Sequence, residues 1–159
     1  MRTRPPQTHT VGVEELLSRT LRKCTVPAGV RVESEVPSTL PPLQVDPLQI
    51  QQVLRNLINN GMEAMPDGGT LEIRASEDKV TNTVTIRIHD SGTGMTAENM
   101  AKLFQPLFTT KARGIGLGLV VVKNLTQANG GKVEVQSEPG RGSSFSITFP
   151  AQNIMAKTA

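Results

Sequence analysis

The sequence predicts a two-layer α+β sandwich, in which helices cover one face of a mixed, mostly antiparallel sheet. Two observations support this prediction. Segments with apolar residues every three or four positions are interspersed with segments in which apolar and polar residues alternate strictly. Each helical segment has a single apolar stripe, so we expect one face of each helix to pack and the other to stay in water.

The composition fits a single globular domain with an aliphatic core. The chain has 159 residues, of which 36% are hydrophobic, with four Phe and neither Trp nor Tyr. A chain of this length can bury its own core. We expect residues 1–10 to be a linker or tail, residues 11–150 to form the domain, and residues 151–159 to be a second tail.

Charge and cysteine content narrow the function classes. The net charge is +3, but the basic residues are dispersed and aromatic residues are nearly absent. Nucleic-acid binding needs a basic stripe with stacking partners, so no nucleic-acid partner is predicted. The lone Cys24 excludes an internal disulfide and fits a reducing compartment. No apolar run reaches the ~20 residues that span a bilayer, so we predict a cytoplasmic segment without membrane insertion.

The first half of the chain predicts two helices and two strands. Residues 11–21 have helical apolar spacing, residues 30–36 alternate as a strand, and residues 43–45 add a short strand after a Pro-rich loop. Asp46 and Pro47 then open the longest helix, since Asp is a good N-cap and Pro is preorganised at the first helical position. Its apolar stripe comprises Ile50, Val53, Leu54, Leu57, Ile58, Gly61 and Met65.

The second half predicts two hairpins separated by a helix. Residues 71–75 and 84–88 alternate as two strands joined by a turn at 78–82, and the second strand ends at His89 and Asp90. An apolar helix follows over 117–128 and ends at a Gly pair. Alternation around 133–135 and 145–149, with a turn between them, predicts the last hairpin.

Two glycine clusters, at 90–94 and 114–118, predict a nucleotide site with a mobile cover formed by residues 96–113. Glycine leaves no Cβ between the main chain and a ligand. The second cluster runs straight into the apolar helix, and a helix N-terminus suits a phosphate group. Lys111 and Arg113 stand just before it. About two turns of helix are expected between the clusters.

Polar residues near these clusters have two interpretations each. Asn56, Asn59 and Asn60 fall within five positions of the long helix, although Asn is a poor helix former. They are either surface residues, or an amide oxygen among them ligates Mg²⁺. Asp90 either belongs to an ordinary turn or accepts a hydrogen bond from an adenine amine.

Together these segments resemble the ATP-binding catalytic domain of two-component sensor histidine kinases, especially the nitrogen-regulator type. This family belongs to the superfamily that also contains gyrase and heat-shock chaperone ATPases. The resemblance covers about residues 11–150. It is carried by four segments in order, which are the Asn box QVLRNLINNGMEAM, the first glycine box DSGTGM, the Phe box LFQPLFTTK and the second glycine box GIGLGL.

The resemblance implies a Bergerat-type sandwich that binds ATP and Mg²⁺. It implies that Asn60 ligates Mg²⁺, that Asn56 helps to organise the phosphates, and that Lys111 reaches the γ-phosphate; these three are the expected catalytic residues. Asp90 would bind adenine. The full set of expected ATP-binding residues is Asn56, Asn60, Asp90, Gly92, Gly94, Met95, Phe108, Thr109, Thr110, Lys111, Arg113, Gly114, Ile115, Gly116, Leu117, Gly118 and Leu119.

Two features depart from the family pattern. Ile115 stands where the family usually has Thr, which we expect to alter affinity rather than abolish binding. Neither His9 nor His89 resembles the phosphoacceptor, a His followed by an acidic residue on a helix. The implied partners are therefore a helical dimerisation and phosphoacceptor domain of the same full-length protein, and the receiver domain of a response regulator. The isolated chain is not expected to phosphorylate itself.

Three alternatives stay open. An ATPase of the gyrase and chaperone type would carry a Glu one helical turn before the metal-binding Asn, where this chain has Asn56, and an amide is no general base at neutral pH. A nucleotide-sensing domain without chemistry is supported only by Ile115 and the missing acceptor. An anti-sigma serine kinase shares the four boxes but is normally a shorter chain.

Overall fold

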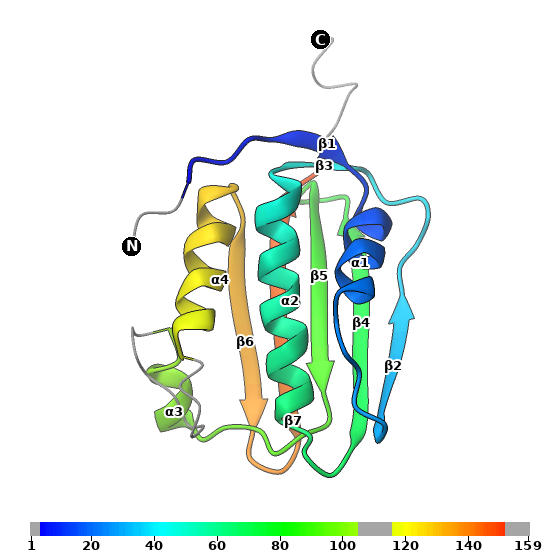
Figure 1. The fold of residues 1–159 in the computed structure, drawn as a ribbon. Helices are drawn as coiled ribbons and strands as arrows, with labels where there is room; N and C mark the ends of the chain where they lie inside the picture. Colours follow the sequence, from blue (N-terminus) through cyan, green and yellow to red (C-terminus); the bar gives the residue numbers. More distant parts are fainter. Residues whose placement is uncertain (1–3, 105–115, 152–159) are drawn as a thin grey trace, which may run out of the picture.

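Helices α1, α2 and α4 lie on one face of a five-stranded sheet in the computed structural model (Figure 1). The structure describes residues 4–104 and 116–151, with the backbone alone for 116–118. The helices are α1 (Val13–Arg22), α2 (Pro47–Glu63), α3 (Ala97–Ala101) and α4 (Gly116–Ala128). Helix α3 is shorter than the two turns predicted between the glycine clusters. None of the helices in these ranges is long and apolar enough to cross a membrane.

The main sheet is mixed and mostly antiparallel, as predicted. Its strand order is β2-β4-β5-β7-β6, in which β2 runs parallel to β4 and every other neighbouring pair is antiparallel. The parallel pair arises because helix α2 lies between β2 and β4 in the chain and returns it to the same end of the sheet. The strands are β2 (Val30–Glu35), β4 (Gly69–Asp78), β5 (Thr83–Asp90), β6 (Lys132–Glu138) and β7 (Gly142–Pro150).

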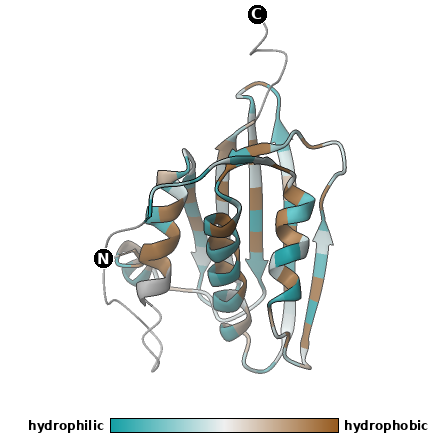
Figure 2. Cartoon of the chain, turned by 45° about the horizontal axis from the view of Figure 1, so that its top comes forward, coloured by the Kyte–Doolittle hydropathy of each residue, from teal (hydrophilic) through white to brown (hydrophobic). Residues whose placement is uncertain are grey.

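The core lies between the helices and the sheet, and the alternation of the strands decides which residues enter it. Figure 2 shows apolar and polar bands alternating along the strands. The aliphatic core predicted from composition is present, although Phe145 and Phe149 are among its largest fully buried side chains. The opposite face is polar. There, for example, Arg74 pairs with Glu72 at 2.8 Å, and His89 Nδ1 lies 2.7 Å from the Ser144 hydroxyl.

Residues 4–11, expected as a tail up to residue 10, are attached to the domain. His9–Val11 form strand β1, which pairs antiparallel with β3 (Leu43–Val45) in a second, two-stranded sheet. In the preceding residues, the Gln7 backbone N–H and the Arg4 guanidinium donate to Asp46 Oδ2, at 2.9 and 2.8 Å. The sequence could not reveal these contacts, because the partners are about forty residues apart and no local pattern links them.

Asp46 caps helix α2, as predicted from its place before Pro47. Its Oδ1 accepts hydrogen bonds from the backbone N–H groups of Leu48 and Gln49, at 3.0 and 3.1 Å. These bonds satisfy two of the donors that a helix N-terminus leaves without partners. The capping residue, Asp46, is only 2% exposed. Burial of a carboxylate is tolerated here because both of its oxygens accept hydrogen bonds.

A polar network extends from Asp46 to the end of helix α4. The Asp46 backbone N–H donates to Asn129 Oδ1 at 2.8 Å. The Asn129 amide donates to Gln49 Oε1 at 3.0 Å and to the Leu125 carbonyl at 2.9 Å. Gln49 in turn donates to the Arg4 carbonyl at 2.6 Å. We refer to Arg4, Asp46, Gln49 and Asn129 as the Asp46 network; it joins the N-terminal segment, α2 and α4.

Burial of Asp46 by itself raises the pKa of its carboxyl group, but the hydrogen bonds from Gln7, Gln49 and Arg4 outweigh burial and lower the pKa below its ordinary value of 3.8. A group whose pKa is lower in the folded state stabilises the fold above its unfolded pKa. This contribution is lost as the pH falls through the folded pKa.

We therefore predict that Asp46→Ala lowers the free energy of unfolding at pH 7 by about 1–3 kcal/mol, through the lost cap and the partners left without an acceptor. Asp46→Asn keeps a capping oxygen but removes the charge that faces Arg4. Its stability deficit relative to wild type should shrink as the pH falls from about 5 to about 3. Urea unfolding across this range measures both effects, with Asp67→Asn in an exposed turn as the control. A deficit that does not change with pH would contradict the role given to the charge.

Candidate nucleotide-binding site

The predicted site residues within the described ranges gather at one end of the sandwich. At this end β5 finishes with Asp90, α2 finishes just after Asn60, and α4 begins at Gly116 (Figure 1). Asn56 lies one helical turn before Asn60 on α2. The fold thus brings the Asn box, the first glycine box and the described end of the second glycine box, residues 116–119, to one place.

Asp90 is held in the sheet on both sides of its strand. Its backbone lies opposite Leu71 of β4 and Ser143 of β7, and the residue is only 2% exposed. Its Oδ1 accepts a hydrogen bond from the Gly92 backbone N–H at 2.9 Å. This bond holds the carboxylate in one orientation.

Helix α2 approaches Asp90 closely because residue 61 is glycine. A methyl group added at Gly61 would lie 2.7 Å from Leu71 Cδ1 and 3.5 Å from Asp90 Cβ. The sequence pattern assigned Gly61 to the apolar stripe of the helix, but it did not predict the contact with Asp90. Glycine inside a helix costs about 1 kcal/mol relative to Ala, and that cost was the available signal that residue 61 has a packing role.

The loop after Asp90 is clamped from two sides. On one side the Thr93 N–H donates to the Ala64 carbonyl at the end of α2, at 3.3 Å. On the other side the Gly140 N–H donates to the Thr93 carbonyl at 2.7 Å, and the Met95 N–H donates to Ser137 Oγ at 2.8 Å. The turn between β6 and β7 therefore helps to shape the site, which sequence reasoning did not foresee because that turn lies more than forty residues away.

Gly94 is required by this clamp. Its φ is +71°, and a methyl group there would lie 1.9 Å from the Glu138 carbonyl oxygen. An L-residue is therefore excluded both by backbone conformation and by contact with a neighbouring main chain. This packing requirement stands beside the expected role of Gly92 and Gly94 in making room for a ligand.

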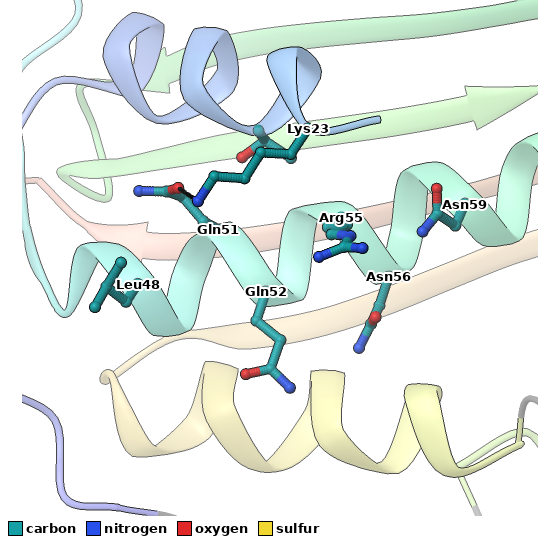
Figure 3. A pocket seen from close by; sticks show the side chains of 8 residues that line it. Lys23, Leu48, Gln51, Gln52, Arg55, Asn56 and Asn59 are labelled. Carbon is teal, nitrogen blue, oxygen red and sulfur yellow. Dashed lines mark hydrogen bonds between the residues drawn. The ribbon is translucent and has the colours of Figure 1, made fainter. Parts of the chain in front are cut away.

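All three asparagines of the Asn box, Asn56, Asn59 and Asn60, are half-buried on α2, and Figure 3 shows Asn56 pointing toward the side on which α4 lies. None of them is fully exposed, as a simple surface residue would be. The described residues contain no group of three or more His, Cys, Asp or Glu side chains that could hold a metal ion.

Residues 116–119 of the second glycine box form the first turn of α4, which begins at Gly116, one residue before the predicted start. Leu119, at the end of this turn, is 7% exposed and belongs to the core. The remaining expected contacts lie outside the described residues, namely Phe108, Thr109, Thr110, Lys111, Arg113, Gly114 and Ile115. The second half of the expected lid, residues 105–113, lies outside them as well.

Comparison with known proteins gives consistent matches. Residues 45–153 match the family model described as histidine kinase-, DNA gyrase B-, and HSP90-like ATPase. The sensor histidine kinase ZraS of Escherichia coli (strain K12) is 43% identical over 119 residues, which are 75% of this chain and 25% of ZraS. The chain thus spans about a quarter of the length of this curated relative.

Two solved structures share the fold. Full-length ShkA, crystallised in complex with AMPPNP, has a TM-score of 0.79 and 26% identity, covering 92% of this chain and 32% of ShkA. The catalytic domain of the histidine kinase ThkA has a TM-score of 0.77 and 25% identity, covering 91% of this chain and 96% of that domain.

The clamp around Gly94 predicts a difference between two glycines with similar backbone conformations. Gly94→Ala should lower the free energy of unfolding by about 3 kcal/mol or more, through a strained φ and a main-chain clash. Gly140→Ala is the matched control, because Gly140 has a φ of +77° but no atom within 4 Å of an added methyl. It should cost only about 1–2 kcal/mol. Equal losses in urea unfolding would show that the contact with Glu138 does not constrain the loop.

Proposed function

The chain belongs to the family of histidine kinase-, DNA gyrase B-, and HSP90-like ATPases, and from this we propose that it is the ATP-binding catalytic domain of a sensor histidine kinase. It donates the γ-phosphate of ATP to a His on a helical dimerisation domain of the same full-length protein. That domain then passes the phosphoryl group to the receiver domain of a response regulator. The observation that carries the proposal is a buried Asp90 at the meeting point of β5, α2 and the glycine loop.

Asp90 is the residue proposed to bind adenine. Its carboxylate accepts a hydrogen bond from the exocyclic amine, and its burial strengthens that bond by excluding water. The Gly92 N–H keeps the carboxylate in a fixed orientation. Because the loop backbone from Gly92 to Met95 is clamped to α2 and to β6, the base meets a rigid edge rather than a loop that must order on binding.

Asn60 and Asn56 are proposed to bind Mg²⁺ and to orient the phosphates. A half-buried amide oxygen on α2, with no cage of carboxylates in the described residues, fits Mg²⁺, which keeps several waters and shares its ligands with phosphates. Mg²⁺ supplies charge neutralisation on the β- and γ-phosphates. Asn60 provides its protein ligand, and Asn56 orients the phosphates one turn earlier.

The start of α4 is proposed to cradle the triphosphate. Its first N–H groups have no intrahelical partner and carry partial positive charge, which favours an anion there. Gly116 and Gly118 allow the phosphates close to this backbone. Lys111 and Arg113, from the segment just before α4, add cationic charge at the γ-phosphate. Transfer then depends on positioning and charge stabilisation rather than on covalent catalysis by the protein.

Asn56 favours a kinase over an ATPase. Water attack needs a general base, and the position one turn before Asn60 holds an amide, which cannot accept a proton at neutral pH. A positioned acceptor His brings its own nucleophilic nitrogen, so phosphoryl transfer to it needs no such carboxylate.

We predict ATP and ADP binding in the micromolar to millimolar range, measured by calorimetry, with Mg²⁺ required for tight ATP binding. Asp90→Asn should weaken ADP binding about 10- to 100-fold, the range expected for a charged hydrogen bond. Inorganic tripolyphosphate, which lacks the base, should bind both proteins equally. Asp67→Asn is the control in an exposed turn. Unchanged ADP affinity in Asp90→Asn would remove Asp90 from the adenine site.

We predict that the chain hydrolyses ATP very slowly and does not label itself, yet phosphorylates the helical acceptor domain of its full-length protein when that domain is added separately. Radiolabelled ATP with and without the acceptor domain tests this. Asn60→Ala should abolish transfer, and Lys111→Ala should weaken it, because they remove the metal ligand and a γ-phosphate cation. Rapid hydrolysis by the chain alone would instead place it among the ATPases.

A further inference from the structure

The solvent-facing side of α2 carries a groove that the proposed nucleotide chemistry leaves largely unused. The groove has a volume of about 400 Å³ and lies between α2 and the end of α1 (Figure 3). Six of its lining residues are spaced three, four or seven apart in two interleaved rows along α2, so they form one helical face. They are Leu48, Gln51, Gln52, Arg55, Asn56 and Asn59.

The charge of this groove has one sign. Lys23, the residue that caps the end of α1, and Arg55 of α2 line it, and no Asp or Glu is among its lining residues. Lys23 Nζ donates to Gln51 Oε1 at 3.4 Å, which carries its charge across from α1 to α2. An adjoining hollow adds Arg19 and Arg22, of which Arg19 already pairs with Glu15. Lys23 and Arg55 thus make a cationic rim around a row of amides.

One end of the groove is apolar. Leu48 is 66% exposed, although α2 otherwise buries its large apolar residues. From Leu48 to Asn59 the face spans three turns, about 16 Å. A face of this length, with an apolar end, hydrogen-bonding amides and cationic rims, matches a helix that carries acidic residues along one side and an apolar residue near one end.

The other end of the groove adjoins the proposed phosphate site. Asn56 lines the groove and is also an expected phosphate residue, and Asn59 directly precedes Asn60. A helix lying in the groove would therefore run toward the γ-phosphate. This is where the protein that accepts the phosphoryl group has to be held.

We propose that the groove between α1 and α2 docks an acidic helical segment of the phosphoacceptor protein, with Lys23 and Arg55 facing its carboxylates and Leu48 its apolar residue. This inference rests on the proposed function and extends it to a recognition surface. Charges at the edge of an interface mainly change association, so they should affect use of the acceptor and leave the chemical step unchanged.

The test is phosphotransfer from the chain to the helical acceptor domain of its full-length protein, with the acceptor concentration varied. Lys23→Glu combined with Arg55→Glu should raise the KM for the acceptor about tenfold or more, with kcat and ATP affinity unchanged. Leu48→Ala should raise it less. Higher ionic strength should raise the wild-type KM and have little further effect on the double variant. Lys79→Glu, in the exposed turn between β4 and β5, is the matched single-charge control.

A wild-type KM in the double variant would overturn the proposal. The proposal would also be overturned if the wild-type chain bound vesicles of phosphatidylserine and phosphatidylcholine and the double variant did not, with transfer to the acceptor unchanged. The occupant would then be a lipid headgroup. Calorimetry of the acceptor domain with the chain separates this inference from the proposed function. Suppose the wild-type chain binds the acceptor domain, the double variant does not, and neither transfers the phosphoryl group. This result supports the groove and rejects the kinase assignment. No binding by the wild type overturns the groove.

Discussion

The buried carboxylate of Asp46 is the constraint on which the placement of α2 depends. A charge that is 2% exposed has to be matched by hydrogen bonds, and its two oxygens accept four, from Arg4, Gln7, Leu48 and Gln49. These donors come from the N-terminal segment and from the first turn of α2. Asn129 extends the same network to the last turn of α4. The start of α2 and the end of α4 are therefore fixed to each other, about 80 residues apart in sequence.

The opposite end of α2 is fixed by close packing rather than by charge. Gly61 lets the helix lie against Asp90 and Leu71, and the Ala64 carbonyl accepts from the loop at Thr93. A helix held at both ends carries Asn56 and Asn60 at defined positions relative to the carboxylate of Asp90. Functional groups on rigid elements are held more precisely than groups on loops. The described part of the site is thus preorganised, and Gly61 and Gly94 serve its packing.

The sequence predicted what is encoded locally. Strand alternation, the Asp46–Pro47 helix start and the turn at Asp78, whose side chain accepts from the Val80 and Thr81 N–H groups, all depend on residues a few positions apart. What the sequence did not predict is nonlocal. The pairings of β1 with β3, of β2 with β4 and of β5 with β7, and the contact of Ser137 with Met95, join segments more than thirty residues apart. Such contacts leave no periodic signal in the sequence.

The geometry of α2 accounts for how one helix contributes to both the proposed nucleotide site and the proposed docking groove. Residues four apart share a face, so Asn56 and Asn60 form one stripe, and Arg55 and Asn59 form the next, rotated by about 100°. Arg55 and Asn59 line the groove, and Gly61, the neighbour of Asn60, lies against Asp90. Both surfaces lie on the same helix, so the rise and rotation of the helix fix the distance between them without a conformational change. Asn56 belongs to both surfaces, so an amide there is compatible with a partner that supplies its own nucleophile, whereas a carboxylate would repel an acidic helix from the groove.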